Sequence, residues 1–358
     1  MERRIRVLIV DDSPVNIAYL RALLDSDPRL EVAGTASSGA EAVERVGTLR
    51  PDVVTMDLQM PGMDGFVATR VIMETVPTPI VVVSASYEAD EIHKSFRAIE
   101  AGALAILPRP AGPGHERHER EVADLLRTVR TMAEVPVVRR WAGVRLAGGV
   151  AERTPSSSPG PREAAMPNRV VAIGASTGGP PVVSAILAGL PKRFAAPVLI
   201  VQHVAAGFVQ GFVDWLSATS AIRVALARDD ELAEPGRAYV APDDVHLGVT
   251  TDGRIRLGRE EPDGGLRPSV AHLFRSVGEA FGPRAIGVLL TGMGGDGATE
   301  LLRMRSKGAL TIAQDAASSV IHGMPGEAIR LGAATYVLPP EGIISALALL
   351  GAGKERDR

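Results

Sequence analysis

Residues 169–181, with the sequence RVVAIGASTGGPP, decide the predicted fold of the second half of the chain. Residues 170–173 are apolar and predict a short buried strand, and the next five residues match the G-x-S-x-G pattern of a nucleophile elbow. Such a tight strand-to-helix turn exposes a serine hydroxyl above the sheet, provided that the flanking residues carry little side-chain bulk. Gly174 and Gly178 meet that requirement on either side of Ser176.

The motif alone leaves other interpretations open, because glycines that follow a strand also cradle phosphate groups or simply close a turn. A helix is predicted from Gly179 to about Leu190. Its free N–H groups would point at the serine, where they can stabilise a developing oxyanion. A catalytic serine also needs a base and a carboxylate, which we seek at the ends of other strands.

The composition predicts a globular protein of two domains, with 358 residues, 46% of them hydrophobic and 23% charged. A net charge of −3 provides no broad basic face for nucleic acid. The absence of cysteine excludes disulfides, thiolate zinc sites and a cysteine nucleophile. No stretch resembles a signal peptide or a membrane span of roughly 18 apolar residues, so we expect a cytoplasmic protein without membrane insertion.

In the first part of the chain, short apolar strands alternate with amphipathic helices, a pattern that predicts a parallel βαβ sheet. The predicted strands are 5–10, 31–35, 52–57, 79–84 and 103–107. Asp11 and Asp12 follow the first strand, Asp57 ends the third and Ser84 ends the fourth, so all four lie at the carboxyl edge. Three converging carboxylates repel one another unless a divalent cation binds them, and their oxygens suit Mg²⁺. The alternative is that Asp12 or Ser13 caps the helix that begins at Pro14, but capping does not explain Asp57.

The segments VLIVDDSP, DVVTMDLQMPGMDG and PIVVVSA resemble the receiver domain of two-component response regulators, over about residues 4–133. The resemblance implies that Asp57 accepts a phosphoryl group, that Asp11 and Asp12 hold Mg²⁺ together with it, and that Ser84 senses the phosphoryl group. This agrees with the chemistry, because a carboxylate that attacks a phosphoryl donor needs a cation to spread the transferred charge.

Two positions depart from the receiver pattern, which has Lys-Pro after the fifth strand and an aromatic residue three positions before the lysine. Here Arg109 replaces the lysine and Ile106 replaces the aromatic residue. A guanidinium keeps the positive charge but is a planar fork rather than a point charge. The chain has four lysines and 35 arginines, so compositional drift and altered switching both remain open.

A last receiver helix is predicted over 116–135, followed by a Pro- and Ser-rich linker with a candidate docking residue, Trp141. The predicted organisation is therefore a receiver domain at 1–135, a linker at 136–167 and a catalytic domain at 168–350.

The catalytic partners of Ser176 are predicted at the ends of two further strands. The strand at 197–201 ends in Gln202-His203, without the acidic residue that a dinucleotide-binding domain needs there, and adjacent parallel strands bring His203 near the serine. The strand at 285–290 precedes TGMGGDG, which contains the candidate carboxylate Asp296. The expected oxyanion donors are the backbone N–H groups of Thr177 and Met293. An alternative role for Asp296 is an N-cap of the helix at 298–307, and the two roles are compatible.

The chain order serine, histidine, aspartate differs from that of α/β-hydrolases, chymotrypsin and subtilisin. GASTGG, QH, YVAPDDVHL, RPSV, LLTGMGGDGA and TIAQDAASSVIHGMP resemble the catalytic domain of chemotaxis protein-glutamate methylesterases, over about 168–350. Relatives often have aspartate after RPSV, where this chain has Ala271. His246 and His322 lie inside these motifs and are expected to be structural; the histidines expected at the surface are His93, His115, His118 and His272.

The predicted fold is α/β: an N-terminal (βα)5 receiver, a flexible linker and a C-terminal doubly wound, mostly parallel α/β domain. The resemblance implies a phosphorylation-activated carboxyl-ester hydrolase that demethylates glutamates and deamidates glutamines of methyl-accepting chemoreceptors. It further implies a chemotaxis histidine kinase as phosphoryl donor, a receiver that covers the active site at rest, and hydrolysis without a cofactor. The alternatives are the same mechanism on another receptor-like substrate, and a non-enzymatic regulator controlled by its receiver.

Overall fold

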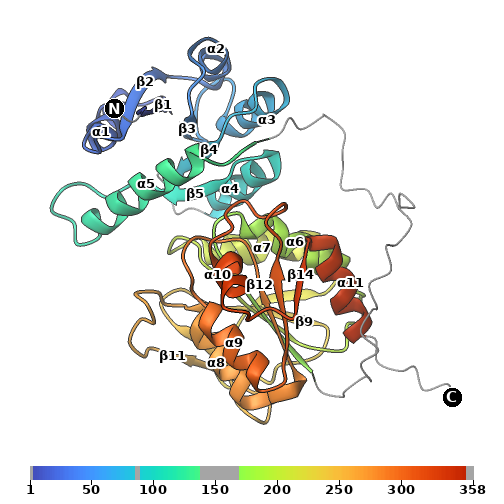
Figure 1. Cartoon of the computed structure of the whole chain (residues 1–358). Helices are drawn as coiled ribbons and strands as arrows, with labels where there is room; N and C mark the ends of the chain where they lie inside the picture. Colours follow the sequence, from blue (N-terminus) through green and yellow to red (C-terminus); the bar gives the residue numbers. More distant parts are fainter. Residues whose placement is uncertain (1–2, 85–88, 138–168, 352–358) are drawn as a thin grey trace.

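In this computed structural model the described residues are 3–84, 89–137 and 169–351, with the side chains of 89–94 excepted (Figure 1). Most of the linker predicted at 136–167 therefore lies outside the described residues, as does Trp141.

The first domain contains a five-stranded parallel sheet in the order β2-β1-β3-β4-β5. Apolar side chains of α2, α3 and α4 cover one face, and those of α1 and α5 cover the other. The strands are β1 Ile5–Val10, β2 Leu30–Ala36, β3 Val53–Met56, β4 Ile80–Ser84 and β5 Ala105–Pro108. The helices are α1 Pro14–Asp25, α2 Gly39–Leu49, α3 Gly65–Thr75, α4 Ala89–Ala101 and α5 His118–Ala133. This confirms the parallel βαβ sheet predicted from the alternation of strands and helices, and the (βα)5 receiver fold that the resemblance implied.

The second domain contains a seven-stranded parallel sheet in the order β14-β13-β12-β6-β7-β9-β8, together with the antiparallel hairpin β10-β11. Helices α6, α7 and α11 pack on one face, and α8, α9 and α10 on the other. The strands are β6 Val170–Ala175, β7 Val198–Gln202, β8 Arg223–Leu226, β9 Arg237–Val240, β10 His246–Val249, β11 Ile255–Gly258, β12 Ala285–Leu289, β13 Leu310–Gln314 and β14 Tyr336–Leu338. The helices are α6 Gly179–Gly189, α7 Val209–Thr219, α8 Val270–Phe281, α9 Ala298–Ser306, α10 Met324–Arg330 and α11 Pro340–Gly351, with a 3-10 turn at Gly282–Arg284. The predicted doubly wound architecture is confirmed.

None of the helices among the described residues combines the length and the apolar character that crossing a membrane requires.

Strand β6 is central in its sheet, and the start of helix α8 packs closely against its carboxyl end. A Cβ atom placed on Gly174 would lie 2.2 Å from Cγ1 of Val270, and one placed on Gly297 would lie 2.4 Å from the same atom. The two glycines therefore let the start of α8 approach both the nucleophile turn and the turn after β12.

Helix α4 of the first domain lies against α6 and α7 of the second (Figure 1). Apolar side chains of the two domains pack together there. Phe96 of α4 stacks on Trp215 of α7 with ring centroids 5.6 Å apart and also contacts Phe212, at 5.5 Å. The Trp215 indole N–H donates to Glu100 Oε1 at 2.5 Å. In addition, the loop after β13 places Val320 and Ile321 against the receiver's hydrophobic cluster beneath α1 and α5.

Gly174→Ala should destabilise the second domain by about 1–3 kcal/mol, because the new methyl group overlaps the Val270 side chain. Adding Val270→Ala should restore much of the loss. Thermal unfolding measures both effects. Gly47→Ala is the control, since a Cβ there meets nothing within 4 Å; equal stability of Gly174→Ala and the wild type would contradict the packing argument.

Candidate active site

Ser176 lies in the turn between β6 and α6, and its backbone is held by both neighbouring strands. Its N–H donates to the Thr291 carbonyl, after β12, at 3.0 Å. Its carbonyl accepts from the Gly179 N–H at 2.8 Å and from the Gln202 side chain, at the end of β7, at 2.7 Å. The Ser176 side chain therefore projects from a turn whose backbone is fixed by hydrogen bonds.

His203 follows β7, and its N–H donates to the Ala175 carbonyl at 2.9 Å. Its ring Nε2 lies 3.1 Å from Asp296 Oδ2, with both side chains mostly buried. The contact is an ion pair when the imidazole is protonated. The structure thus brings together the predicted base and carboxylate, one strand away from the predicted nucleophile.

Asp296 also binds the start of helix α8. Its Oδ2 accepts from the Val270 N–H at 2.7 Å, and its Oδ1 accepts from the Ala271 N–H at 2.9 Å. Burial raises the pKa of Asp296, but His203 and these two N–H groups together outweigh burial and hold its pKa below the ordinary value. The carboxylate is therefore ionised at neutral pH.

The alternative in which Asp296 caps the helix at 298–307 is wrong, because the N-cap of α9 is Gly297, with no side-chain hydrogen bond. Asp296 binds the N–H groups at the start of α8 instead, a helix that precedes it in the chain. Ala271, which departs from the family pattern, takes part through its backbone, and its side chain is buried.

The expected oxyanion donors lie beside the serine. Among the described residues no hydrogen bond uses the N–H of Thr177 or Met293, and Gly292 packs against Ser176, where an added Cβ would lie 2.7 Å from the serine Cβ. Helix α6 does not supply the expected free N–H groups at its first three residues. Gly179 donates to the Ser176 carbonyl, and the next two residues are prolines, which have no N–H.

In the receiver, Asp11, Asp12 and Asp57 place carboxylate oxygens within 4.8 Å of one another. Burial, followed by the neighbouring Asp11, raises the pKa of Asp57 to about 6, although Arg109 and two backbone N–H groups act in the opposite direction. Arg109 lies within 4 Å of Asp11 and Asp57 and brings one positive charge to these three carboxylates, which leaves an excess of negative charge. The oxygen donors and excess charge of the cluster are typical of a Mg²⁺ site.

Arg109 enters this cluster closer to Asp11 than to Asp57. Its guanidinium donates to Asp11 Oδ2 at 2.9 Å and lies 3.9 Å from Asp57 Oδ2. The backbone N–H of Arg109 donates to the Ser84 carbonyl at 2.7 Å, and this bond joins the end of β4 to the end of β5. Ile106 is half-buried and packs against the receiver core as well as the cluster that contains Phe96 and the second domain's helices.

Several polar side chains near the site had no clear signal in the sequence. Gln202 and Thr291 bind the backbone of the nucleophile turn, and a glutamine or threonine at a strand end does not by itself predict that role.

The expectation that His272 is a surface residue is wrong, because it is half-buried and stacks on buried His246 with ring centroids 4.4 Å apart. His118 is also half-buried and its Nδ1 contacts the Ala111 carbonyl at 2.7 Å. His115 is exposed, and the side chain of His93 lies outside the described residues.

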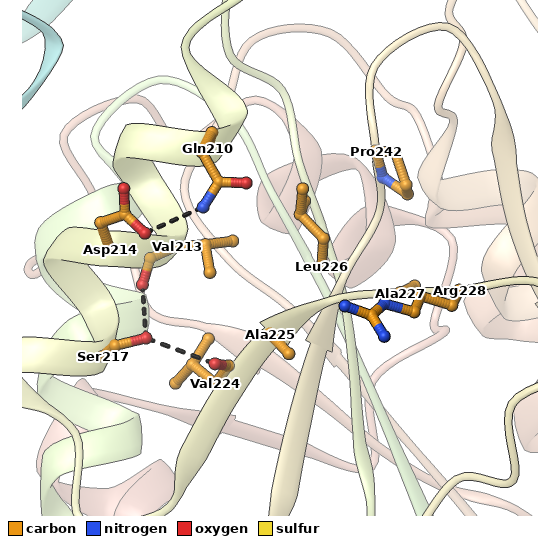
Figure 2. A pocket seen from close by; sticks show the side chains of 10 residues that line it. All are labelled: Gln210, Val213, Asp214, Ser217, Val224, Ala225, Leu226, Ala227, Arg228 and Pro242. Carbon is orange, nitrogen blue, oxygen red and sulfur yellow. Dashed lines mark hydrogen bonds between the residues drawn. The ribbon is translucent and has the colours of Figure 1, made fainter. Parts of the chain in front are cut away.

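A cavity of about 470 Å³ lies elsewhere, between α7 and the edge strand β8 (Figure 2). It is lined by Gln210, Asp214, Ser217 and neighbouring residues, and Ser217 donates to the Val213 carbonyl at 2.7 Å. None of the three candidate catalytic side chains lines it, so this cavity does not mark the site.

The comparisons with known proteins agree with this geometry. A model of the CheB methylesterase family matches residues 171–347, and a model of the response regulator receiver domain matches residues 7–117. A protein-glutamate methylesterase/protein-glutamine glutaminase of Geobacter metallireducens is 56% identical over 98% of this chain and 100% of its own length. One from Nitrosospira multiformis is 51% identical over 96% of each chain.

The second domain also resembles a solved structure. The crystal structure of the Thermotoga maritima CheB methylesterase catalytic domain is 37% identical, with a TM-score of 0.50, and covers 52% of this chain and 100% of that one. The chain therefore belongs to the CheB family of chemotaxis protein-glutamate methylesterases/protein-glutamine glutaminases, with a receiver domain ahead of its methylesterase domain.

Proposed function

We propose that Ser176, His203 and Asp296 form the catalytic triad of this chain and hydrolyse γ-methyl esters of glutamate on methyl-accepting chemoreceptors. The observation that carries the proposal is the convergence of the serine, histidine and aspartate at the carboxyl edge of one parallel sheet, with Nε2 of His203 3.1 Å from Asp296. We also propose a receiver at 1–135, a linker at 136–167 and a catalytic domain at 168–350.

In this mechanism Ser176 Oγ attacks the ester carbonyl while His203 takes the hydroxyl proton. Because Nε2 of the ring lies at Asp296, Nδ1 is the nitrogen available to the serine. The N–H groups of Thr177 and Met293 stabilise the oxyanion. His203 returns the proton to the leaving methanol, and water then hydrolyses the acyl-enzyme by the same steps. With a glutamine side chain the leaving group is ammonia.

Ser176→Ala should lower the turnover number for methanol release by about 10⁴- to 10⁶-fold, and His203→Ala nearly as much, since triad members act as a unit. The measurement is methanol release from a methylated receptor fragment. Ser184→Ala, a change at a half-buried hydroxyl on α6 that bonds Thr219, is the control for the serine change. Full activity of Ser176→Ala would exclude the serine as nucleophile.

The receiver is proposed to bind Mg²⁺ through Asp11, Asp12 and Asp57 and to accept a phosphoryl group on Asp57 from a chemotaxis histidine kinase. The three converging carboxylates support this, together with the raised pKa of Asp57. A bound Mg²⁺ neutralises charge during phosphoryl transfer. Asp57 supplies the attacking oxygen, Ser84 lies at the neighbouring strand end as a hydroxyl partner, and Arg109 supplies a fixed positive charge.

The receiver is further proposed to restrain the methylesterase domain until Asp57 is phosphorylated. The contacts that support this are the Phe96, Phe212 and Trp215 cluster and the packing of Val320 against the receiver. Val320 also lies against the nucleophile turn, because a Cβ on Gly178 would be 2.4 Å from Cβ of Val320. The receiver therefore reaches a loop that borders the proposed site.

A chain that starts at Met166 should consequently hydrolyse ester faster than the unphosphorylated full-length protein. The full-length variant Phe96→Ala should also hydrolyse ester faster than the unphosphorylated full-length protein, because Trp215 loses its stacking partner from α4. Initial rates of methanol release measure both. Equal rates for the two chains would mean that the receiver localises the enzyme and does not inhibit it.

Phosphorylation should activate this enzyme less than a relative with lysine and an aromatic residue, because the Arg109 guanidinium is already paired with Asp11. The double variant Arg109→Lys with Ile106→Phe should increase the ratio of hydrolysis rates with and without a phosphoryl donor. Each tenfold change in that ratio corresponds to about 1.4 kcal/mol. The two single variants are the controls, and an unchanged ratio in the double variant would identify Arg109 as an equivalent substitute.

The remaining alternative is the same hydrolysis on a receptor-like protein outside chemotaxis. Methanol release from chemoreceptor fragments, compared with other methylated proteins, discriminates between the two substrates.

A further inference from the structure

Gln202 is a buried amide that contacts both halves of the proposed catalytic machinery without being part of it. It ends strand β7 with 3% of its surface exposed. Its Nε2 donates to the carbonyl of Ser176 at 2.7 Å and to the carbonyl of His203 at 3.0 Å. Because both acceptors are carbonyl oxygens, the orientation of the amide is determined by its neighbours.

The bond to Ser176 has a consequence for the next residue. The Ser176 carbonyl and the Thr177 N–H belong to one planar trans peptide, so they point in opposite directions. Gln202 and the Gly179 N–H both hold the carbonyl oxygen, at 2.7 and 2.8 Å, toward the interior. The Thr177 N–H is thereby directed away from the interior, on the side where the proposed oxyanion forms. A hydrogen bond to the carbonyl also polarises the peptide and strengthens its N–H as a donor.

The carbonyl oxygen of the Gln202 side chain, Oε1, gives a reason to think that packing alone does not require a glutamine here. Among the described residues, Oε1 of Gln202 has no hydrogen-bond partner. It lies over the start of α6, where a Cβ on Gly179 would be 2.2 Å away and where Pro180 and Pro181 offer no N–H. A buried acceptor without a partner is costly, so an apolar side chain of similar length would suit the fold better. The donor end of the amide is what the site uses.

We propose that Gln202 is a positioning residue that orients the Thr177 N–H toward the oxyanion and fixes the backbone of His203 relative to that of Ser176. The inference rests on the proposed catalytic roles of Ser176, His203 and Thr177. Both hydrogen bonds of the Gln202 side chain go to backbone carbonyls, so it acts through Thr177 and His203.

The test compares Gln202→Met and Gln202→Glu with the wild type in the full-length protein, using methanol release from a methylated receptor fragment. Loss of a whole oxyanion donor costs about 10²- to 10³-fold in kcat, so a misdirected donor should cost about 10- to 100-fold, with KM changed by less than about threefold.

The Gln202→Glu variant adds a pH readout that a purely structural role would not produce. A protonated carboxyl group can still donate to the Ser176 carbonyl, whereas a carboxylate faces two carbonyl oxygens with no hydrogen to offer. Its kcat relative to wild type should therefore rise as the pH falls from about 8 to about 6, since burial raises the pKa of a carboxyl group. The same ratio for Gln202→Met should stay constant.

Gln314→Met is the matched control for loss of a buried amide. Gln314 ends strand β13, is fully buried, and bonds the Thr291 N–H and Ser318 rather than Ser176 or His203. Because both ends of the Gln314 amide are hydrogen-bonded, Gln314→Met should lower the melting temperature at least as much as Gln202→Met does, with a smaller loss of kcat. Equal losses of kcat in the two methionine variants would overturn the inference, as would wild-type kcat in both Gln202 variants. A wild-type protein without esterase activity would instead overturn the catalytic assignment itself.

Discussion

The arrangement of the methylesterase domain depends on the contacts of one mostly buried carboxylate, that of Asp296. It binds the first N–H groups of α8 and lies 3.1 Å from His203, so one charge fixes both a helix and the proposed base. Because α8 is held there, its first residue, Val270, packs against the nucleophile turn and leaves room only for glycine at 174 and 297. Packing against α8, as well as the geometry of the turn, therefore requires small residues in the serine motif.

The sequence predicted the alternation of strands and helices and the residues at the strand ends, because buried parallel strands have a strong apolar signal and ligands gather at their carboxyl edge. It also predicted that Ser176, His203 and Asp296 share that edge. It did not predict that Asp296 binds α8, since a helix cap from a residue that follows the helix leaves no local pattern. Gln202 was missed for a similar reason, because its role depends on two backbone carbonyls that only the folded sheet brings together.

In the methylesterase domain the Asp296 carboxylate is stabilised by His203 and two N–H groups, whereas in the receiver several carboxylates repel one another. Its carboxylates crowd one edge, and burial next to Asp11 raises the pKa of Asp57 to about 6. Arg109 brings a positive charge to this edge. Its guanidinium lies closer to Asp11, at 2.9 Å, than to Asp57, at 3.9 Å. A guanidinium held by one carboxylate must leave or stretch that contact to follow a new phosphoryl charge on the other. We therefore expect Arg109 to respond to a phosphoryl group on Asp57 differently from the lysine of other receivers.

In the proposed mechanism, a charge change at Asp57 acts on the methylesterase domain through an interface that is mostly apolar. Ile106 packs against both the receiver core and the cluster containing Phe96, which in turn stacks on Trp215. Full burial of one such side chain stabilises a contact by about 1.5–3 kcal/mol, and a tenfold population shift takes only about 1.4 kcal/mol. If the proposed restraint operates, a small displacement of α4 that uncovers part of one ring suffices to change how often the domains are docked. Since Val320 lies between the receiver and the nucleophile turn, undocking would also free the loop that borders Ser176.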